Sequence, residues 1–243
     1  MSANIYLRWL STVLACTAFC HTQAATVTAR VAWEKGAGNA ARAHENGNVV
    51  FWLTLIEGDG PASPPAKKTS PRLRLLQKNK SFEPHALVVP VGSLVEFPNR
   101  DPFFHNVFSL FEGKRFDLGL YEAGTTRDVH FDKQGVSYIF CNIHPEMSAV
   151  VIAVQTPYYA TSDARGEITI RDVPAGRYTL RVWYDAATAE TLNSMTRQIT
   201  VSEGKLALGV FRLVRTNVVQ SHKNKYGRDY DPPVPDSPAY PHP

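Results

Sequence analysis

Residues 136–147 read Val-Ser-Tyr-Ile-Phe-Cys-Asn-Ile-His-Pro-Glu-Met. In the first half of this stretch an apolar or aromatic residue recurs at every second position, which predicts a strand that ends at Cys141. The next apolar run, 148–154, predicts the following strand. Cys141, His144 and Met147 therefore lie on one short loop that joins two neighbouring strands.

The loop carries three side chains that can bind a metal: a thiolate, an imidazole and a thioether. A second imidazole, His105, lies upstream between aromatic residues. On its own, a histidine in such surroundings is by default a packed and hydrogen-bonded core residue, but the loop lacks one strong ligand that His105 would supply. Two imidazole nitrogens, one thiolate and a weak second sulfur form the ligand set of a mononuclear electron-transfer copper site. Zinc normally takes a stronger fourth ligand than methionine.

Bulk composition sets limits on the class of protein. A chain of 243 residues can form one large domain or two small ones. The formal net charge of +4 is mild and no long basic run is present, so we expect no nucleic-acid partner.

The N-terminus has the pattern of an export signal. Arg8 precedes an apolar stretch at 9–19 that is too short to span a bilayer, and Ala24-Ala25 offers a cleavage point. We therefore expect a periplasmic protein without a membrane span. Cys16 and Cys20 leave a lipid-anchored form as an alternative, although the residues before Cys16 match a lipid-attachment box poorly.

Removal of this leader changes the cysteine count. Of the three cysteines, only Cys141 would remain, so the exported protein could form no internal disulfide. Such a cysteine is reactive, paired with another chain, bound to a metal, or simply buried as an apolar residue. The neighbouring His144 and Met147 favour the metal.

The motif and its surroundings resemble the blue-copper (cupredoxin) family over the middle third to half of the chain. The short loop with proline after histidine is most similar to the amicyanin branch, within an amicyanin- and plastocyanin-like group. The residues that carry the resemblance are Cys141-x-x-His144-Pro145-x-Met147, Tyr138-x-Phe140, His105-Asn106-Val107, and Gly92, Phe97, Asn99 and Asp101 ahead of them.

The resemblance implies one type 1 copper ion held by His105, Cys141 and His144, with Met147 as a long axial ligand. Ligands of this kind need outer partners that fix their orientation. The resemblance supports Asn106 as such a partner, bridging to the cysteine-bearing loop, while a turn-forming asparagine is an equal alternative.

Two more residues are expected to shape the site. Pro145 removes a backbone N–H next to His144 and stiffens the loop. We also expect the edge of His144, with Pro145 and Phe103 around it, to form the electron-exchange surface.

A second unit resembles the carboxypeptidase regulatory-like (transthyretin-like) β-sandwich, a fold signature that carries no chemistry. The matching residues are Asp163-x-x-Gly166, Val173-Pro174-x-Gly176-x-Tyr178-x-Leu180 and Val182-Trp183. The unit is short for a full sandwich, and we hypothesise that strands near the N-terminus complete it.

Together these patterns predict an all-β chain: a cupredoxin Greek-key β-sandwich followed by a smaller β-sandwich module. We expect a signal peptide at 1–25, N-terminal strands at 26–57, a linker at 58–72, the cupredoxin domain at 73–155, the β-module at 156–215 and a disordered Pro-rich tail at 216–243.

The expected function is that of a periplasmic electron carrier, a monomer that exchanges electrons with redox proteins. The alternative is a periplasmic copper-binding or delivery protein. An enzyme is not expected, because nitrite-reductase or multicopper-oxidase chemistry needs a second copper centre and the His-x-His pairs that build one are absent. The architecture resembles periplasmic proteins of methylamine utilisation, but no residue specifies that partner.

Overall fold

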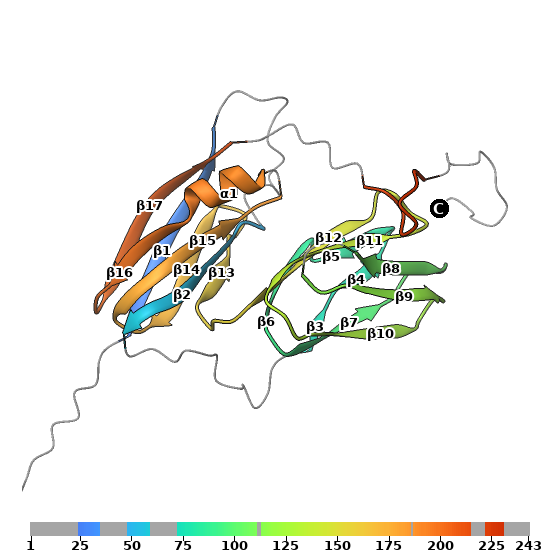
Figure 1. The fold of residues 1–243 in the computed structure, drawn as a ribbon, viewed down its shortest axis with the longest axis horizontal. Coiled ribbons are helices and arrows are strands. Elements are labelled where there is room, and N and C mark those ends of the chain that lie inside the picture. Colours follow the sequence, from blue (N-terminus) through green and yellow to red (C-terminus); the bar gives the residue numbers. More distant parts are fainter. Residues whose placement is uncertain are drawn as a thin grey trace, which may run out of the picture.

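Two β-sandwiches lie side by side in the computed structural model (Figure 1). The structure describes residues 24–34, 48–58, 72–110, 113–185, 187–214 and 222–230. The predicted all-β fold class is confirmed. The predicted signal peptide, nearly all of the predicted linker and most of the predicted tail fall outside the described residues.

The first sandwich, here called the terminal sandwich, is built from both ends of the chain. One of its sheets has the strand order β14-β1-β17 and the other has the order β13-β2-β15-β16. Its strands are β1 (Ala25–Trp33), β2 (Val50–Gly58), β13 (Tyr159–Thr161), β14 (Glu167–Val173), β15 (Gly176–Trp183), β16 (Arg197–Val201) and β17 (Lys205–Leu213).

The two N-terminal strands pair with strands of the C-terminal module. Strand β1 lies antiparallel to β14 and parallel to β17, and β2 lies antiparallel to β13 and β15. Alternate residues of β1 point into a hydrophobic core that also contains Phe51, Tyr178 and Leu180. The module is short because part of its core is supplied from the other end of the chain, as we hypothesised.

The second, central sandwich carries the predicted ligands. Its sheets have the orders β6-β12-β11-β8-β9 and β10-β7-β3, with a hairpin of β4 and β5 beside them. Its strands are β3 (Leu73–Arg74), β4 (Leu76–Lys78), β5 (Ser81–Glu83), β6 (Ala86–Pro90), β7 (Ser93–Pro98), β8 (His105–Ser109), β9 (Phe116–Tyr121), β10 (Thr126–Phe131), β11 (Gly135–Cys141) and β12 (Ser148–Val154).

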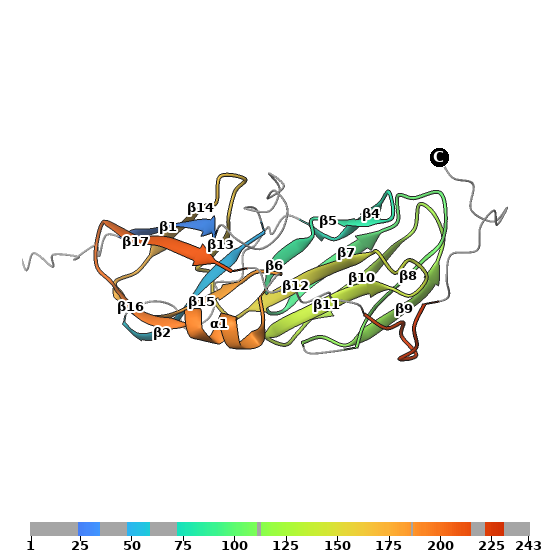
Figure 2. The ribbon, with the colours of Figure 1, turned by 90° about the horizontal axis from the view of Figure 1, so that it is seen from above.

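Strand β12 is buried on both faces and joins the two sandwiches. Ala149, Val151 and Ala153 belong to the central core, while Val150, Ile152 and Val154 pack against residues of the terminal sandwich. Figure 2 shows β6 and β12 where the two sandwiches meet. This double burial explains the continuous apolar run at 149–154. The cluster between the sandwiches comprises Val50, Trp52, Ala86, Val88, Val150, Ile152, Val154 and Trp183.

Two features differ from the sequence-based expectation. A short helix, α1 (Ala189–Met195), follows β15 and is capped at its N-terminus by Thr188, whose side chain accepts a hydrogen bond from the backbone N–H of Thr191. Residues 222–230, within the tail predicted to be disordered, form a turn that contacts the ligand loop. In the described parts of the chain no helix has the length and apolar character that a bilayer crossing requires.

An ion pair also links the sandwiches: His85 Nε2 lies 3.3 Å from Asp185 Oδ2. The hydrogen bond to Asp185 raises the pKa of His85 above its ordinary 6.5, although burial opposes the shift. The charged pair therefore stabilises the folded state fully below pH 6.5 and loses this contribution as pH rises through the higher folded-state pKa.

In metal-free protein, we expect the contribution of this ion pair to the free energy of unfolding to fall as the pH rises from about 6 to about 8. The loss should be less than about 1 kcal/mol, because both side chains are partly exposed. Urea unfolding of wild type and His85→Gln measures it. The stability difference between them should shrink as pH rises, and a difference that is constant with pH would show that His85 is not charged in the folded state.

Candidate metal centre

Strand pairing in the central sandwich brings the upstream histidine to the loop. Strand β11 pairs antiparallel with β8 so that Cys141 lies opposite Val107. His105 begins the same strand β8, two residues before Val107, so its side chain projects from the same face of the sheet. The far end of the loop is fixed because β12 pairs with β11 from Ser148 onward.

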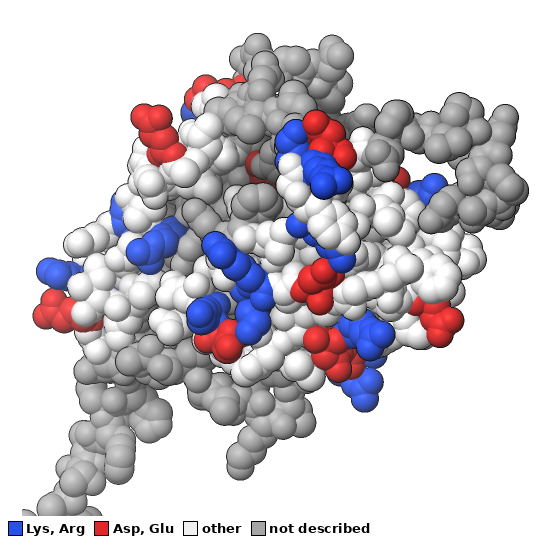
Figure 3. All heavy atoms as spheres, turned by 45° about the vertical axis from the view of Figure 1, so that its right-hand side comes forward, with Lys and Arg blue, Asp and Glu red and all other residues white. Residues whose placement is uncertain are grey.

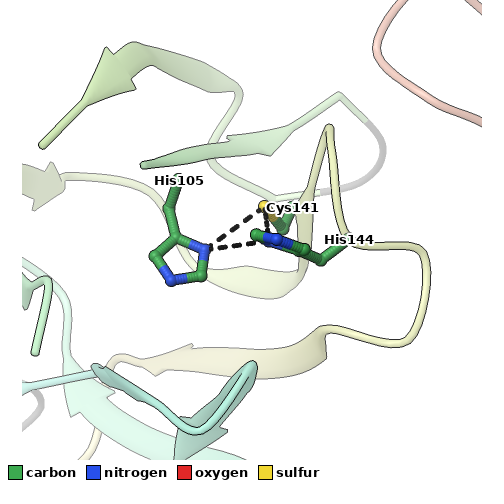
Figure 4. Close-up of side chains that lie close together, drawn as sticks. All are labelled: His105, Cys141 and His144. Atoms are coloured by element: carbon green, nitrogen blue, oxygen red, sulfur yellow. Dashed lines mark hydrogen bonds between the residues drawn. The ribbon is translucent and has the colours of Figure 1, made fainter. Parts of the chain in front are cut away.

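Three donor atoms converge at this end of the sandwich (Figure 4). Cys141 Sγ lies 3.6 Å from His105 Nδ1 and 3.5 Å from His144 Nδ1. The two Nδ1 atoms are 3.2 Å apart. All three residues are buried, and residues far apart in the sequence thus form one compact group that could hold a metal ion.

The spacing of the donors fits a metal ion. A point equidistant from three atoms at these separations lies about 2.0 Å from each, close to a metal–imidazole bond of about 2.0–2.1 Å and slightly short of a metal–thiolate bond of about 2.3 Å. The donor set of two imidazoles and one thiolate suits copper.

The orientation of His105 is fixed by Asp101. His105 Nε2 lies 2.9 Å from Asp101 Oδ2, and both side chains are buried. Because a carboxylate only accepts hydrogen bonds, Nε2 carries the proton and the lone pair of Nδ1 points at Cys141. The carboxylate is itself held by the backbone N–H groups of Asn79 and Lys80, at 2.6 and 3.0 Å.

Burial keeps both imidazoles neutral at physiological pH. It lowers the pKa of His105, against an opposing effect of Asp101, and lowers the pKa of His144 to about 4. Burial also raises the pKa of the Cys141 thiol, while hydrogen bonds from the backbone of Asn106, Ile143 and His144 oppose that rise. Neutral imidazoles are ready to bind a metal, whereas the thiol must lose its proton on binding.

The loop between Cys141 and Met147 closes on itself. The backbone N–H of Met147 donates to the carbonyl of His144 at 3.1 Å, and that of Cys141 donates to the carbonyl of Met147 at 3.3 Å. The Met147 side chain is fully buried in the same core cluster as Cys141. The predicted fourth ligand therefore belongs to the interior of the site's own sandwich.

His144 is the least buried of the four predicted ligands. It is 6% exposed, whereas His105, Cys141 and Met147 are 0% exposed. The ring of Phe103 lies 5.4 Å from the rings of both histidines. The structure thus brings Phe103 next to His144, as the sequence predicted.

The two predicted supporting residues act through the main chain. The carbonyl of Asn106 accepts from the N–H of Asn142 at 2.8 Å, but its side-chain amide donates to Asp117, at 2.7 Å. The expected bridge to the cysteine loop is therefore made by the backbone of Asn106. The carbonyl of Pro145 accepts a hydrogen bond from His222 Nε2, at 2.7 Å.

Sequence reasoning missed three residues that touch the site. Asp101 was noted only as part of the approach to His105, and its role as the acceptor of the His105 ring is a finding of the structure. His222 and Tyr230 lay in a tail predicted to be disordered. The aromatic residues in that tail were the one signal that it could pack.

Comparisons with solved structures give cupredoxins as neighbours. A purple cupredoxin from Nitrosopumilus maritimus is 23% identical, over 34% of this chain and 99% of that protein, with a TM-score of 0.31. A copper-containing nitrite reductase from Thermus scotoductus SA-01 is 26% identical, over 40% of this chain and 26% of that protein, with a TM-score of 0.34.

An amicyanin variant in the Cu(I) form is 19% identical over 36% of this chain and 87% of that protein, with a TM-score of 0.33. At these scores the likenesses establish no function for this chain. The family model described as polysaccharide lyase family 4, domain II, matches residues 145–207. This match covers less than half of the chain and does not assign it to a family. The comparison with curated proteins gives no match.

We expect Asp101→Asn to weaken metal binding by about 10- to 100-fold, the usual cost of losing a partner that orients a ligand. An amide has one acceptor oxygen, so it cannot serve the His105 ring and both backbone N–H groups. A competition titration with a chelator measures the affinity. Asp132→Asn, which alters an exposed carboxylate paired with Lys114, is the control and should bind as wild type does. Equal affinity of the Asp101 variant would mean that Asp101 does not orient His105.

Proposed function

We propose that this chain is a periplasmic electron carrier that holds one copper ion at His105, Cys141 and His144, with Met147 as a distant fourth ligand. The observation that carries the proposal is the convergence of one sulfur and two imidazole nitrogens, 3.2–3.6 Å apart, in a buried site. When bound, copper would supply a one-electron Cu(I)/Cu(II) couple.

The protein's part in this function is to hold the ligands still. Two ligands lie within or at the end of paired strands, a third lies on a loop closed by its own hydrogen bonds, and Asp101 fixes a ring. A preorganised set of ligands needs little rearrangement when the charge at the site changes. Burial of Cys141 also keeps water away from the sulfur.

Electrons would enter and leave through the edge of His144. The half-buried Phe103 ring lies 5.4 Å from the His144 ring, and the exposed Pro145 follows His144 in the loop. On the face shown in Figure 3, acidic and basic side chains are interspersed. Among the described residues several opposite charges pair, as Arg74 does with Glu96 and Lys114 with Asp132. These features favour a redox partner that docks through apolar contact around His144.

Copper delivery is the alternative function. A delivery site exposes ligands that exchange easily, whereas these four are at most 6% exposed. Fast and reversible one-electron cycling with copper retained would favour the carrier, and ready transfer of copper to a chelator would favour delivery. We propose no substrate chemistry, because the sequence lacks the His-x-His pairs of copper enzymes with a second centre.

The proposed site predicts an intense blue colour when Cu(II) is added to the exported, tag-free protein. We expect one equivalent to bind, and Cys141→Ser to abolish the colour because the thiolate–copper bond is lost. Visible absorption with metal analysis measures both. A colourless wild-type complex with full copper occupancy would contradict the blue-copper proposal.

The exchange surface can be tested with Phe103→Glu. In electron self-exchange the same patch of two molecules meets, so a carboxylate on each copy adds like-charge repulsion and should slow the reaction about tenfold or more at low salt. The rate should recover partly at high salt. Visible absorption checks that copper stays bound.

Val210→Glu is the matched control, because Val210 is a 55% exposed apolar residue on β17 of the terminal sandwich. It should leave the self-exchange rate unchanged. If Phe103→Glu keeps its copper and its rate, the exchange surface lies elsewhere.

A further inference from the structure

Residues 222–230 form a compact turn that packs on the outside of the ligand loop. The turn is closed by its own hydrogen bonds: the backbone N–H of Asn224 donates to the carbonyl of Arg228 at 2.9 Å, and Asn224 Oδ1 accepts from the N–H of Arg228 at 3.1 Å. The two residues at its ends, His222 and Tyr230, both reach the loop.

These two side chains hold main-chain carbonyls on either side of His144. The hydroxyl of Tyr230 donates to the carbonyl of Cys141 at 2.8 Å. His222 Nε2 donates to the carbonyl of Pro145 at 2.7 Å, since a carbonyl only accepts. The Tyr230 hydroxyl also lies 3.1 Å from His222 Nδ1, so the two side chains are neighbours at the base of the turn.

Further contacts fix the turn at other points. The His222 ring stacks on Phe140, with centroids 4.0 Å apart and an angle of 22° between the planes. The backbone N–H of Lys225 donates to Asn142 Oδ1 at 2.9 Å, and Lys225 Nζ lies 2.8 Å from Asp117 Oδ2. Asp117 in turn accepts from the Asn106 amide, which follows His105 in β8.

We propose that residues 222–230 are a clamp that positions the ligand loop, with Tyr230 and His222 as its positioning residues. Neither residue is a ligand in our assignment. Tyr230 holds the carbonyl of Cys141, which is itself a proposed ligand, and His222 holds the carbonyl of Pro145, which follows the proposed ligand His144. Both hydrogen bonds therefore limit how far the two ligands can move. The effect on copper rests on the proposed function, whereas the effect on the loop does not.

The clamp makes the loop's rigidity depend on a segment about eighty residues away in the chain, Lys225 being 83 residues from Asn142. Without the clamp, the loop would move more when the charge of the metal changes, and copper would be released faster than from the clamped loop. A single hydrogen bond contributes about 0.5–1.5 kcal/mol, so its loss should raise loop opening by about 2- to 10-fold.

The test uses full-length Tyr230→Phe, which removes only the hydroxyl, and His222→Phe, which retains an aromatic ring to stack on Phe140. In metal-free protein, amide hydrogen exchange across residues 141–147 should be about 2- to 10-fold faster in each variant. In copper-loaded protein, release to a chelator should be faster by a similar factor, with a shifted visible band.

Tyr226→Phe is the matched control, since it removes a hydroxyl from a ring in the same turn that is 70% exposed. It should behave as wild type in both measurements. If both clamp variants exchange at the wild-type rate across 141–147, the clamp is wrong whatever copper does. Faster exchange in a protein that binds no copper would support the clamp and refute the proposed function instead.

Discussion

The antiparallel register between β8 and β11 is the constraint on which the site depends. It sets Cys141 opposite Val107 and thereby brings His105 beside the thiol. A shift of one residue would turn the side chains of one strand to the other face of the sheet. The register is protected by its surroundings, because Val107 and Cys141 are both completely buried in the central core.

The rest of the molecule restrains the loop that completes the site. Strand β12 begins directly after Met147 and is buried between the central core and the terminal sandwich. The terminal sandwich thus supports the far end of the loop through cluster residues such as Ile152 and Trp52. Figure 1 shows the clamp, residues 222–230 in red, at the end of the central sandwich that is far from the terminal sandwich, beside the loop between β11 and β12. Strands and clamp together leave the ligands little freedom.

Local patterns in the sequence were enough to predict most of the strands and the grouping of His105, Cys141 and His144. Alternation gave β11, a continuous apolar run gave β12, and the tight spacing of Cys141 and His144 indicated a common metal. The short module also indicated that distant strands complete it, because its own strands could not cover a core. These are features that depend on neighbours in the sequence or on composition.

The features that were missed depend on contacts between distant segments. Asp101 orients His105 through a loop held by backbone N–H groups, which no spacing rule specifies. The polar, proline-rich composition of the tail predicts disorder, yet residues 222–230 pack through the rings of His222 and Tyr230 and through Lys225. Asn106 was expected to act through its amide, and it reaches the loop through its main chain instead.

X-ray absorption at the copper edge of the loaded protein tests the central claim most directly. Coordination by Cys141, His105 and His144 predicts one sulfur at about 2.2–2.3 Å and two nitrogens at about 2.0 Å, the bond lengths of thiolate and imidazole ligands. Those distances should fit the donor positions of the metal-free site without rearrangement. A spectrum with only nitrogen and oxygen neighbours would contradict the account, because copper would then be bound without the thiolate of Cys141.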